Sequence, residues 1–224
     1  MIEIRKYDEN PIEEIGKVAG ICWGADLTNT EKNFKRGLEC IENNHGRVME
    51  FTSIQIVIDE YSARVIRELY THVIGTSRLQ ESTRYVDCSD FSYYTPKGIE
   101  ANATAKELYD KHMESAKETY KALIGLGCRK EDVAGVLPLN HNSKMVLLIN
   151  LRALFHLFEL RLCGRAYEEF RKLMIEIKRE LSKISDEWKL LCDTYFKPKC
   201  LNLGYCDERY SCGLMPKKDT IINK

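Results

Sequence analysis

The sequence predicts an α+β fold that is dominated by helices and has few strands. Apolar residues recur at helical spacing over several long segments, whereas only two short segments show the alternation that is typical of strands. The chain has 224 residues, enough for one large domain or two small ones. Its composition, 44% hydrophobic and 30% charged, is that of an ordinary globular protein.

The elements follow from these patterns and from the residues that start and stop helices. We expect strands at residues 2–6 and 50–58, and helices at residues 11–20, 30–44, 60–72, 100–126, 130–136, 143–162 and 166–186. Asn29 or Thr30 is the expected N-cap of the second helix, and Asp59 that of the third. Residues 77–85 are expected to be extended or irregular, and the chain from Pro198 onward to be loop-like.

Charge and hydropathy exclude some classes of function. The 34 basic and 34 acidic residues leave no net charge, which argues against broad electrostatic binding to nucleic acid. No apolar run approaches the ~18 residues of a membrane span. The first residues lack the apolar core of a signal peptide, so we expect a cytoplasmic protein with no membrane partner.

Nine cysteines are unevenly placed along the chain. Five are scattered, as suits reduced intracellular thiols, and the other four lie near the end: Cys192, Cys200, Cys206 and Cys212. We therefore expect one catalytic domain, residues 1–190, followed by a cysteine-rich tail, residues 191–224. The C-x5-C-x5-C spacing differs from the usual zinc spacing, so we assign no metal ligand; zinc, an iron–sulfur centre and disulfides remain alternatives to free thiols.

The segment 143–162 combines an apolar pattern with a few polar groups. As a helix it would place Asn150 and Arg161 on one largely apolar face. A buried arginine needs an anionic partner, so Arg161 either forms an internal salt bridge or meets a ligand. Arg152, His156 and Glu159 would lie on the opposite face, where a surface ladder of polar contacts is the expectation.

The stretch SRLQESTRY, residues 77–85, has an unusual number of groups that bind phosphate. On an extended chain, Gln80, Ser82 and Arg84 would point to one side, with Arg78 nearby. An amide, a hydroxyl and a guanidinium in that arrangement suit a phosphate and a polar ring. The alternative is a solvated polar loop.

Three separated segments together resemble the flavin-dependent thymidylate synthases, the ThyX family. SRLQESTRYV resembles the nucleotide-binding segment of the family, residues 136–163 its long active-site helix, and residues 45–72 the strand and helix that precede its signature motif. The resemblance covers roughly residues 15–172. It implies a small antiparallel sheet packed against long helices, in a homotetramer whose active sites each draw on several subunits.

The resemblance also implies a reaction. The family converts dUMP to dTMP, with methylenetetrahydrofolate as the carbon source and FAD, reduced by NADPH, as the hydride source. Arg161 matches an arginine that favours the ionised uracil ring, and Glu68 matches a position that touches the nucleotide. The other expected nucleotide ligands are Gln80, Glu81, Ser82, Thr83 and Arg84, and the expected flavin ligands are His72, Arg78, Asn150, Arg152 and His156.

The sequence departs from the family signature at several positions. The signature is Arg-His-Arg, seven residues and Ser; here Thr71-His72-Val73 is followed by eight residues before Ser82. Gly135 stands where the family usually has an arginine. These losses leave two alternatives open: one-carbon transfer to C5 of another pyrimidine nucleotide, and a non-catalytic nucleotide-binding homologue.

Overall fold

The computed structural model describes residues 1–222, which form two compact units. The first unit contains residues 57–72 and 78–146 together with Met1. The second unit contains residues 2–56 and 73–77 and the chain from Leu147 onward.

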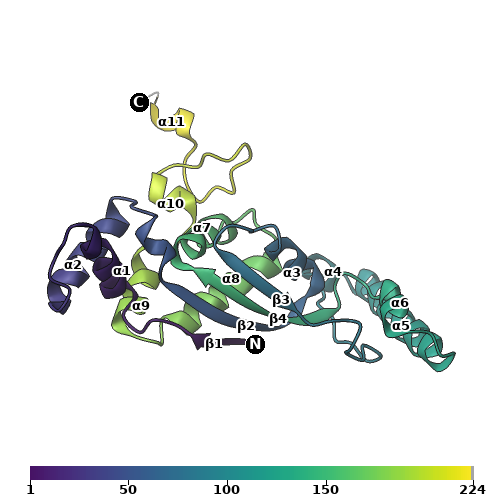
Figure 1. The fold of residues 1–224 in the computed structure, drawn as a ribbon. Helices are drawn as coiled ribbons and strands as arrows, with labels where there is room; N and C mark the ends of the chain where they lie inside the picture. Colours follow the sequence, from purple (N-terminus) through teal and green to yellow (C-terminus); the bar gives the residue numbers. More distant parts are fainter. Residues whose placement is uncertain (223–224) are drawn as a thin grey trace. The chain divides into compact units, whose positions relative to one another are not determined.

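Four strands form an open antiparallel sheet with the order β1-β2-β4-β3. They are β1 (Ile2–Lys6), β2 (Ser53–Ser62), β3 (Thr76–Gln80) and β4 (Asn142–Asn150), as Figure 1 shows. Burial alternates along β4, where Met145, Leu147 and Ile149 are at most 1% exposed. The prediction of a helix-rich α+β fold with few strands is thus confirmed.

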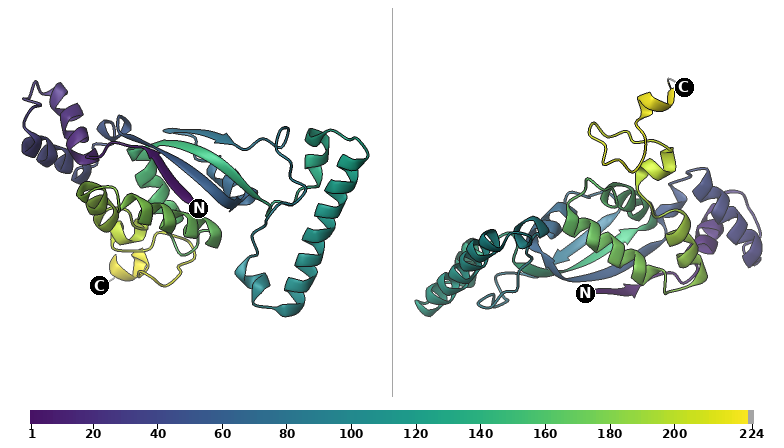
Figure 2. Two further views of the ribbon diagram at one scale, coloured as in Figure 1. Left: turned by 90° about the horizontal axis from the view of Figure 1, so that it is seen from below. Right: turned by 180° about the vertical axis from the view of Figure 1, so that it is seen from behind.

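The second unit contains most of the apolar core. Its helices are α1 (Pro11–Cys22), α2 (Thr30–Glu42), α7 (Leu151–Arg161), α8 (Glu168–Leu181) and α9 (Asp186–Thr194), followed by the short α10 (Lys199–Leu203) and α11 (Lys218–Ile222) (Figure 2). Helices α1 and α2 approach closely because Gly16 has no side chain: a Cβ there would lie 1.8 Å from the carbonyl oxygen of Asn33. Phe158 and Phe196 stack at 4.3 Å in the core of this unit.

The first unit is built around α3 (Ala63–Leu69) and α5 (Ala103–Gly125), with short α4 (Lys97–Glu100) and α6 (Lys130–Val133). Asn102 caps α5 by accepting a hydrogen bond from the Ala105 amide at 3.1 Å. Met113 and Tyr120, two turns apart on α5, are fully or nearly fully buried. Val65, Ile66 and Leu69 of α3 are also inaccessible to solvent.

The prediction of one helix over residues 143–162 is wrong. Residues 142–150 form β4, and the helix begins only at Leu151. Val146 and Leu148 are apolar although they lie on the less buried face of β4. The run MVLLI is therefore apolar throughout, and the alternation of buried and exposed residues cannot be seen in the sequence. A short continuous apolar run cannot be assigned to strand or helix by periodicity alone.

Two helix starts also differ from the prediction. Strand β2 continues through Asp59, so α3 is capped by Ser62, whose Oγ accepts from the Val65 amide at 3.2 Å. The helix predicted over 166–186 ends at Leu181, and α9 begins after Ser185, which accepts from the Trp188 amide at 3.3 Å. The expected cap at Asn29 is confirmed, with a bond of 2.9 Å from the Lys32 amide.

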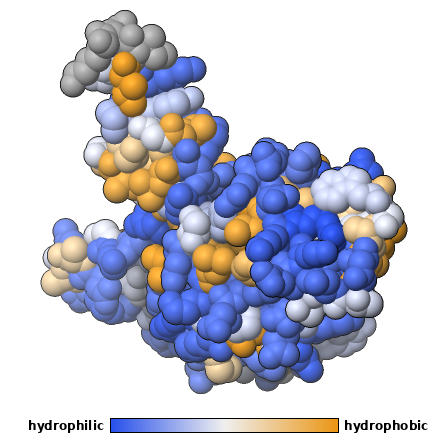
Figure 3. All heavy atoms as spheres, turned by 90° about the vertical axis from the view of Figure 1, so that its left-hand side faces the viewer, coloured by the Kyte–Doolittle hydropathy of each residue, from blue (hydrophilic) through white to orange (hydrophobic). Residues whose placement is uncertain are grey.

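None of the helices within residues 1–222 is both long and apolar enough to cross a membrane. The face drawn in Figure 3 is mostly hydrophilic, with only small apolar areas.

The alternating burial of β4 predicts unequal effects of two neighbouring substitutions. Leu147→Ala removes a fully buried side chain and should lower the free energy of unfolding by about 2–5 kcal/mol. Leu148→Ala, at a position 38% exposed, should lower the free energy of unfolding by clearly less. Urea denaturation of both variants measures the difference, and equal losses would be at odds with the observed strand.

Candidate functional site

A cleft of about 630 Å³ lies within the first unit. One wall is α3 with the turn that follows it, the second is α5, and the third is the loop before β4, including Leu139 and Asn140. We call it the α3–α5 cleft. A volume of this size is in the range of small-molecule sites.

The α3–α5 cleft has more basic than acidic side chains. Arg64, Arg67 and His112 line it together with a single carboxylate, Glu68, which lies 4.0 Å from the Arg64 guanidinium. Arg67 is exposed and forms no hydrogen bond or ion pair with any residue in 1–222. An available guanidinium beside a cleft is suited to bind a phosphate or carboxylate in a bidentate manner.

Tyr109 forms an ordered aromatic wall of the same cleft. Its hydroxyl donates to the Tyr94 carbonyl at 2.9 Å and accepts from Asn140 Nδ2 at 2.8 Å. Tyr93 packs edge-on against this ring, 6.0 Å between centroids, and donates to Asp110 at 3.1 Å. Burial and the Asp110 carboxylate raise the pKa of Tyr93 to about 12, so the phenol stays neutral at physiological pH.

The residues of SRLQESTRY do not form the single extended row that their spacing suggests. Gln80 ends β3 and donates to Ser143 Oγ at 3.2 Å, but the chain then turns, with the Tyr85 amide donating to the Ser82 carbonyl at 3.0 Å. Arg84 pairs with Glu131 at 3.0 Å and remains largely exposed. The Ser82 hydroxyl accepts from the Arg84 amide, which stabilises the turn.

Arg78 and His72 stabilise the connection between α3 and β3. Arg78 Nη1 donates to the carbonyl oxygens of Tyr70 at 2.6 Å and His72 at 3.0 Å. The same guanidinium lies 5.1 Å from the centroid of the Tyr70 ring. Arg78 therefore orders the segment in which the family signature would lie.

The second unit contains the remaining predicted residues. Asn150 is the N-cap of α7: its Oδ1 accepts from the Ala153 amide at 2.9 Å. The expectation that Asn150 and Arg161 share a helix face is therefore wrong, because Asn150 precedes the helix. The Arg161 guanidinium lies 4.6 Å from the ring centroid of Phe170 and is half-buried.

Arg152 and His156 lie one turn apart on the exposed side of α7. Arg152 pairs with Glu50 at 2.5 Å, so the predicted ladder from Arg152 to His156 is replaced by a contact with the segment before β2. Glu159 instead accepts from Asn202 Nδ2 at 2.9 Å.

Of the predicted residues, only Glu68 lines the α3–α5 cleft. Its other functional candidates, Arg64, Arg67, Tyr109 and His112, were not predicted. Arg64 stands four residues before Glu68, and Arg67 four residues before Thr71, a helical spacing that could have indicated a shared face. Nothing in the sequence alone indicates that α5 packs beside α3.

Four cysteines of the second unit line a small cavity of about 40 Å³: Cys163, Cys200, Cys206 and Cys212. Burial raises the pKa of the Cys200 thiol, and the thiols of Cys163, Cys206 and Cys212 raise it further. Within residues 1–222 there is no disulfide, and no three ligand-type side chains are already arranged around a metal position.

Cys192 does not belong to this group, contrary to its place in the predicted cluster. Its side chain is 1% exposed in the core, and Sγ lies 3.4 Å from the Lys178 carbonyl oxygen. Its position on α9, next to the buried Leu191, directs it into the core instead of the tail. The fourth cysteine that lines the cavity is instead Cys163, two residues after the end of α7.

Comparison with known proteins identifies the family. The family model described as "Thymidylate synthase complementing protein" (Thy1) matches residues 3–185. A flavin-dependent thymidylate synthase of Nitratidesulfovibrio vulgaris is 34% identical over 194 residues, covering 81% of this chain and 76% of the relative. A protein with the same name from Pyrococcus furiosus is 30% identical over 96% of this chain and 91% of its own length.

A third relative with this name, from Geobacter sulfurreducens, is 31% identical over 75% of this chain. All three relatives carry the name flavin-dependent thymidylate synthase. The chain belongs to the thymidylate synthase complementing protein (Thy1) family, so the resemblance inferred from its motifs is confirmed.

The environments of the cysteines predict different reactivities. Burial raises the pKa of Cys192 to about 12, so this thiol should not react with iodoacetamide in the native protein at pH 8. Cys22 and Cys128 are exposed and should be alkylated. Peptide mass spectrometry gives the labelled fraction at each position, with urea-denatured protein as the control in which all nine react. Rapid native labelling of Cys192 would disagree with its burial.

Proposed function

We propose that the chain catalyses the reductive methylation of dUMP to dTMP, with methylenetetrahydrofolate as the carbon donor and FAD as the cofactor. The observation that supports this most strongly is the family match over residues 3–185, a range that includes every residue predicted for the site. The basic α3–α5 cleft adds a second, structural observation, since a nucleotide phosphate needs cationic ligands.

The second unit provides groups that fit a flavin cofactor. The main chain of Gly75 has a positive φ of 73°, and a Cβ there would lie 2.6 Å from Asn150 Oδ1, so Asn150 packs directly on this glycine. Arg152 and His156 are exposed nearby on α7 and could bind the anionic pyrophosphate of FAD. When bound, FAD supplies the hydride; the residues of the chain bind and orient it.

Arg161 is the residue we assign to the pyrimidine. A half-buried guanidinium that donates to the ring at N3 and O2 would stabilise the ionised uracil, which makes C5 nucleophilic. Its position above the Phe170 ring restricts the side chain and reduces the entropy lost on binding. No side chain of the enzyme needs to attack the pyrimidine.

We assign nucleotide phosphate binding in part to Arg67. The family signature has arginines at the positions of Thr71 and Val73, and both are absent here. Arg67 and Thr71 are one helical turn apart and both line the α3–α5 cleft. Arg67 can therefore supply the missing charge from the preceding turn, with Ser82 and Arg84 as the further phosphate ligands expected from the family.

The remaining parts of the proposal follow the family. The enzyme works as a cytoplasmic homotetramer, in which residues of different subunits complete each active site, and NADPH reduces the flavin. The predicted ligands belong to both units: Glu68, His72, Arg78 and residues 80–84 to the first, and Asn150, Arg152, His156 and Arg161 to the second. Light scattering of the purified protein measures the subunit number directly.

A product assay tests the proposed reaction. The chain purified with FAD should be yellow and should form dTMP from dUMP in the presence of NADPH and methylenetetrahydrofolate, as measured by mass spectrometry of the nucleotides. Other pyrimidine nucleotides serve as controls. Modification of one of these, with dUMP unchanged, would support the base-modifying alternative, and a colourless protein with no product from any nucleotide would refute both enzymatic readings.

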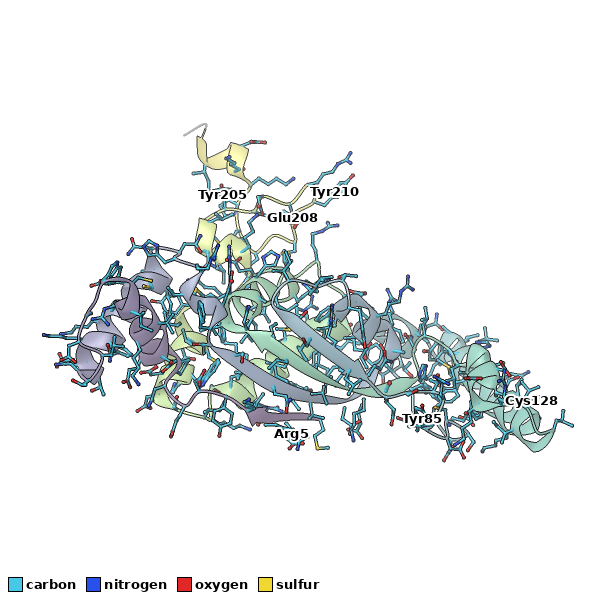
Figure 4. The ribbon with its side chains drawn as sticks, viewed as in Figure 1. Arg5, Tyr85, Cys128, Tyr205, Glu208 and Tyr210 are labelled. Atoms are coloured by element: carbon cyan, nitrogen blue, oxygen red, sulfur yellow. The ribbon has the colours of Figure 1, made fainter. Side chains whose placement is uncertain are left out.

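Arg67→Ala should raise KM for dUMP about tenfold or more while the flavin content stays unchanged, because a charge-assisted bond to the phosphate is worth about 1.5–3 kcal/mol. Arg67→Lys should raise KM for dUMP by less, since lysine keeps the charge but not the bidentate geometry. Arg5→Ala is a matched control on β1, at the exposed arginine labelled in Figure 4. Unchanged dUMP kinetics in Arg67→Ala would exclude this role.

A further inference from the structure

The end of the chain has almost no apolar core of its own. Of residues 197–221, the part of the tail that follows the buried Phe196, Cys206 is the only one that is buried. The tail contains α10, α11 and an intervening loop that carries Glu208 and Tyr210, labelled in Figure 4. A segment this small cannot bury enough surface to be ordered by the hydrophobic effect and usually needs a cross-link or a metal.

The observed contacts of the tail are mainly polar and exposed. Arg165 donates to the Tyr210 carbonyl at 2.9 Å, Asn202 donates to Glu159 at 2.9 Å, and Lys199 pairs with Asp207. Exposed polar pairs contribute little stability individually. These contacts place the tail beside the end of α7, but they are too weak to account for its stability in that position.

Three parts of the second unit place a thiol around the same small cavity. Cys163 lies two residues after the end of α7, Cys200 lies in α10, and Cys206 and Cys212 lie in the loop that follows α10. Cys212 packs on the main chain of Gly164: a Cβ at Gly164 would lie 3.0 Å from Cys212 Sγ. The main chain at Cys206 is held by a 2.7 Å hydrogen bond from its amide to the Pro216 carbonyl.

We propose that Cys163, Cys200, Cys206 and Cys212 bind one zinc ion, which joins the tail to the end of α7. Four cysteines are a common ligand set of structural zinc sites. The cavity of about 40 Å³ has room for a single ion. Glu159, Asp207 and Glu208 also line it, against Arg165 and Lys199, so the local charge favours a cation.

Binding requires the thiols to rearrange. Since no three ligands are already arranged around a metal position in residues 1–222, the cysteine side chains must change rotamer as the ion enters. The zinc ion takes up four thiolates and four protons are released, which leaves a site with two negative charges beside Arg165 and Lys199. Ordering of a small segment by its metal is the usual behaviour of such sites.

Metal titration of the reduced full chain tests the proposal. Zinc added to chelator-treated protein should bind with one ion per chain, and cobalt should give the absorption of a tetrahedral thiolate site. Cys206→Ser and Cys163→Ser should each weaken zinc binding at least tenfold. Cys128→Ser, at an exposed cysteine of the first unit, is the matched control and should bind as the wild type does.

A glycine pair distinguishes the site from non-specific thiol binding. Gly164→Ala keeps every thiol but crowds Cys212, so it should also weaken zinc binding, whereas Gly98→Ala, with open space around it, should not. The proposal fails if the wild type binds no zinc, if the serine variants bind equally well, or if untreated protein contains iron with sulfide or two tail disulfides instead. Flavin content and dTMP formation are separate measurements, so either proposal can fail without the other.

Discussion

The junction between β4 and α7 at Asn150 fixes the framework of the second unit. The Asn150 amide donates to the Gly75 carbonyl at 2.9 Å, its side chain caps α7, and the next amide, of Leu151, donates to Thr52 at 2.8 Å. Three segments far apart in sequence are thereby joined by backbone hydrogen bonds at one point. Because a helix must begin there, Arg152, His156 and Arg161 have defined positions along α7.

Under the proposed function, the α3–α5 cleft of the first unit would bind the nucleotide phosphate without the two arginines of the family signature. Thr71 and Val73 cannot replace guanidinium groups, yet Arg67 and Arg64 place two such groups along the same cleft. A helical turn separates Arg67 from Thr71, so a long arginine side chain can reach a similar region from a neighbouring position. A sequence motif requires an arginine at a given position in the chain, whereas phosphate binding requires only that a guanidinium lies near the phosphate.

Local signals in the sequence predicted much of the fold. The cap at Asn29, the long helix α5 and strand β1 follow from the pattern of residues and agree with the structure. The helix prediction for residues 142–150 was wrong because the apolar Val146 and Leu148 hide the alternation of a strand. The strand is selected by the tertiary environment, which the sequence does not show. The family motifs indicated the class of protein although the strand and helix assignment around Asn150 was wrong.

The candidate site was less predictable for a related reason. Glu68 was found through a motif, but Arg67, Tyr109 and His112 meet it only because α5 packs beside α3, a contact between residues about 40 positions apart. The grouping of Cys163 with the tail thiols likewise depends on where α7 ends. Spacing along the chain favoured Cys192, which the core of the second unit instead buries.

The most direct test of this account moves the arginine back to its family position. The double variant Arg67→Ala with Thr71→Arg should recover the KM for dUMP to within about threefold of the wild type, since a difference of that size is less than about 1 kcal/mol. Thr71→Arg alone should not weaken dUMP binding. If the double variant stays as impaired as Arg67→Ala, or if neither substitution affects KM, the displaced arginine does not bind the nucleotide and the account of the cleft is wrong.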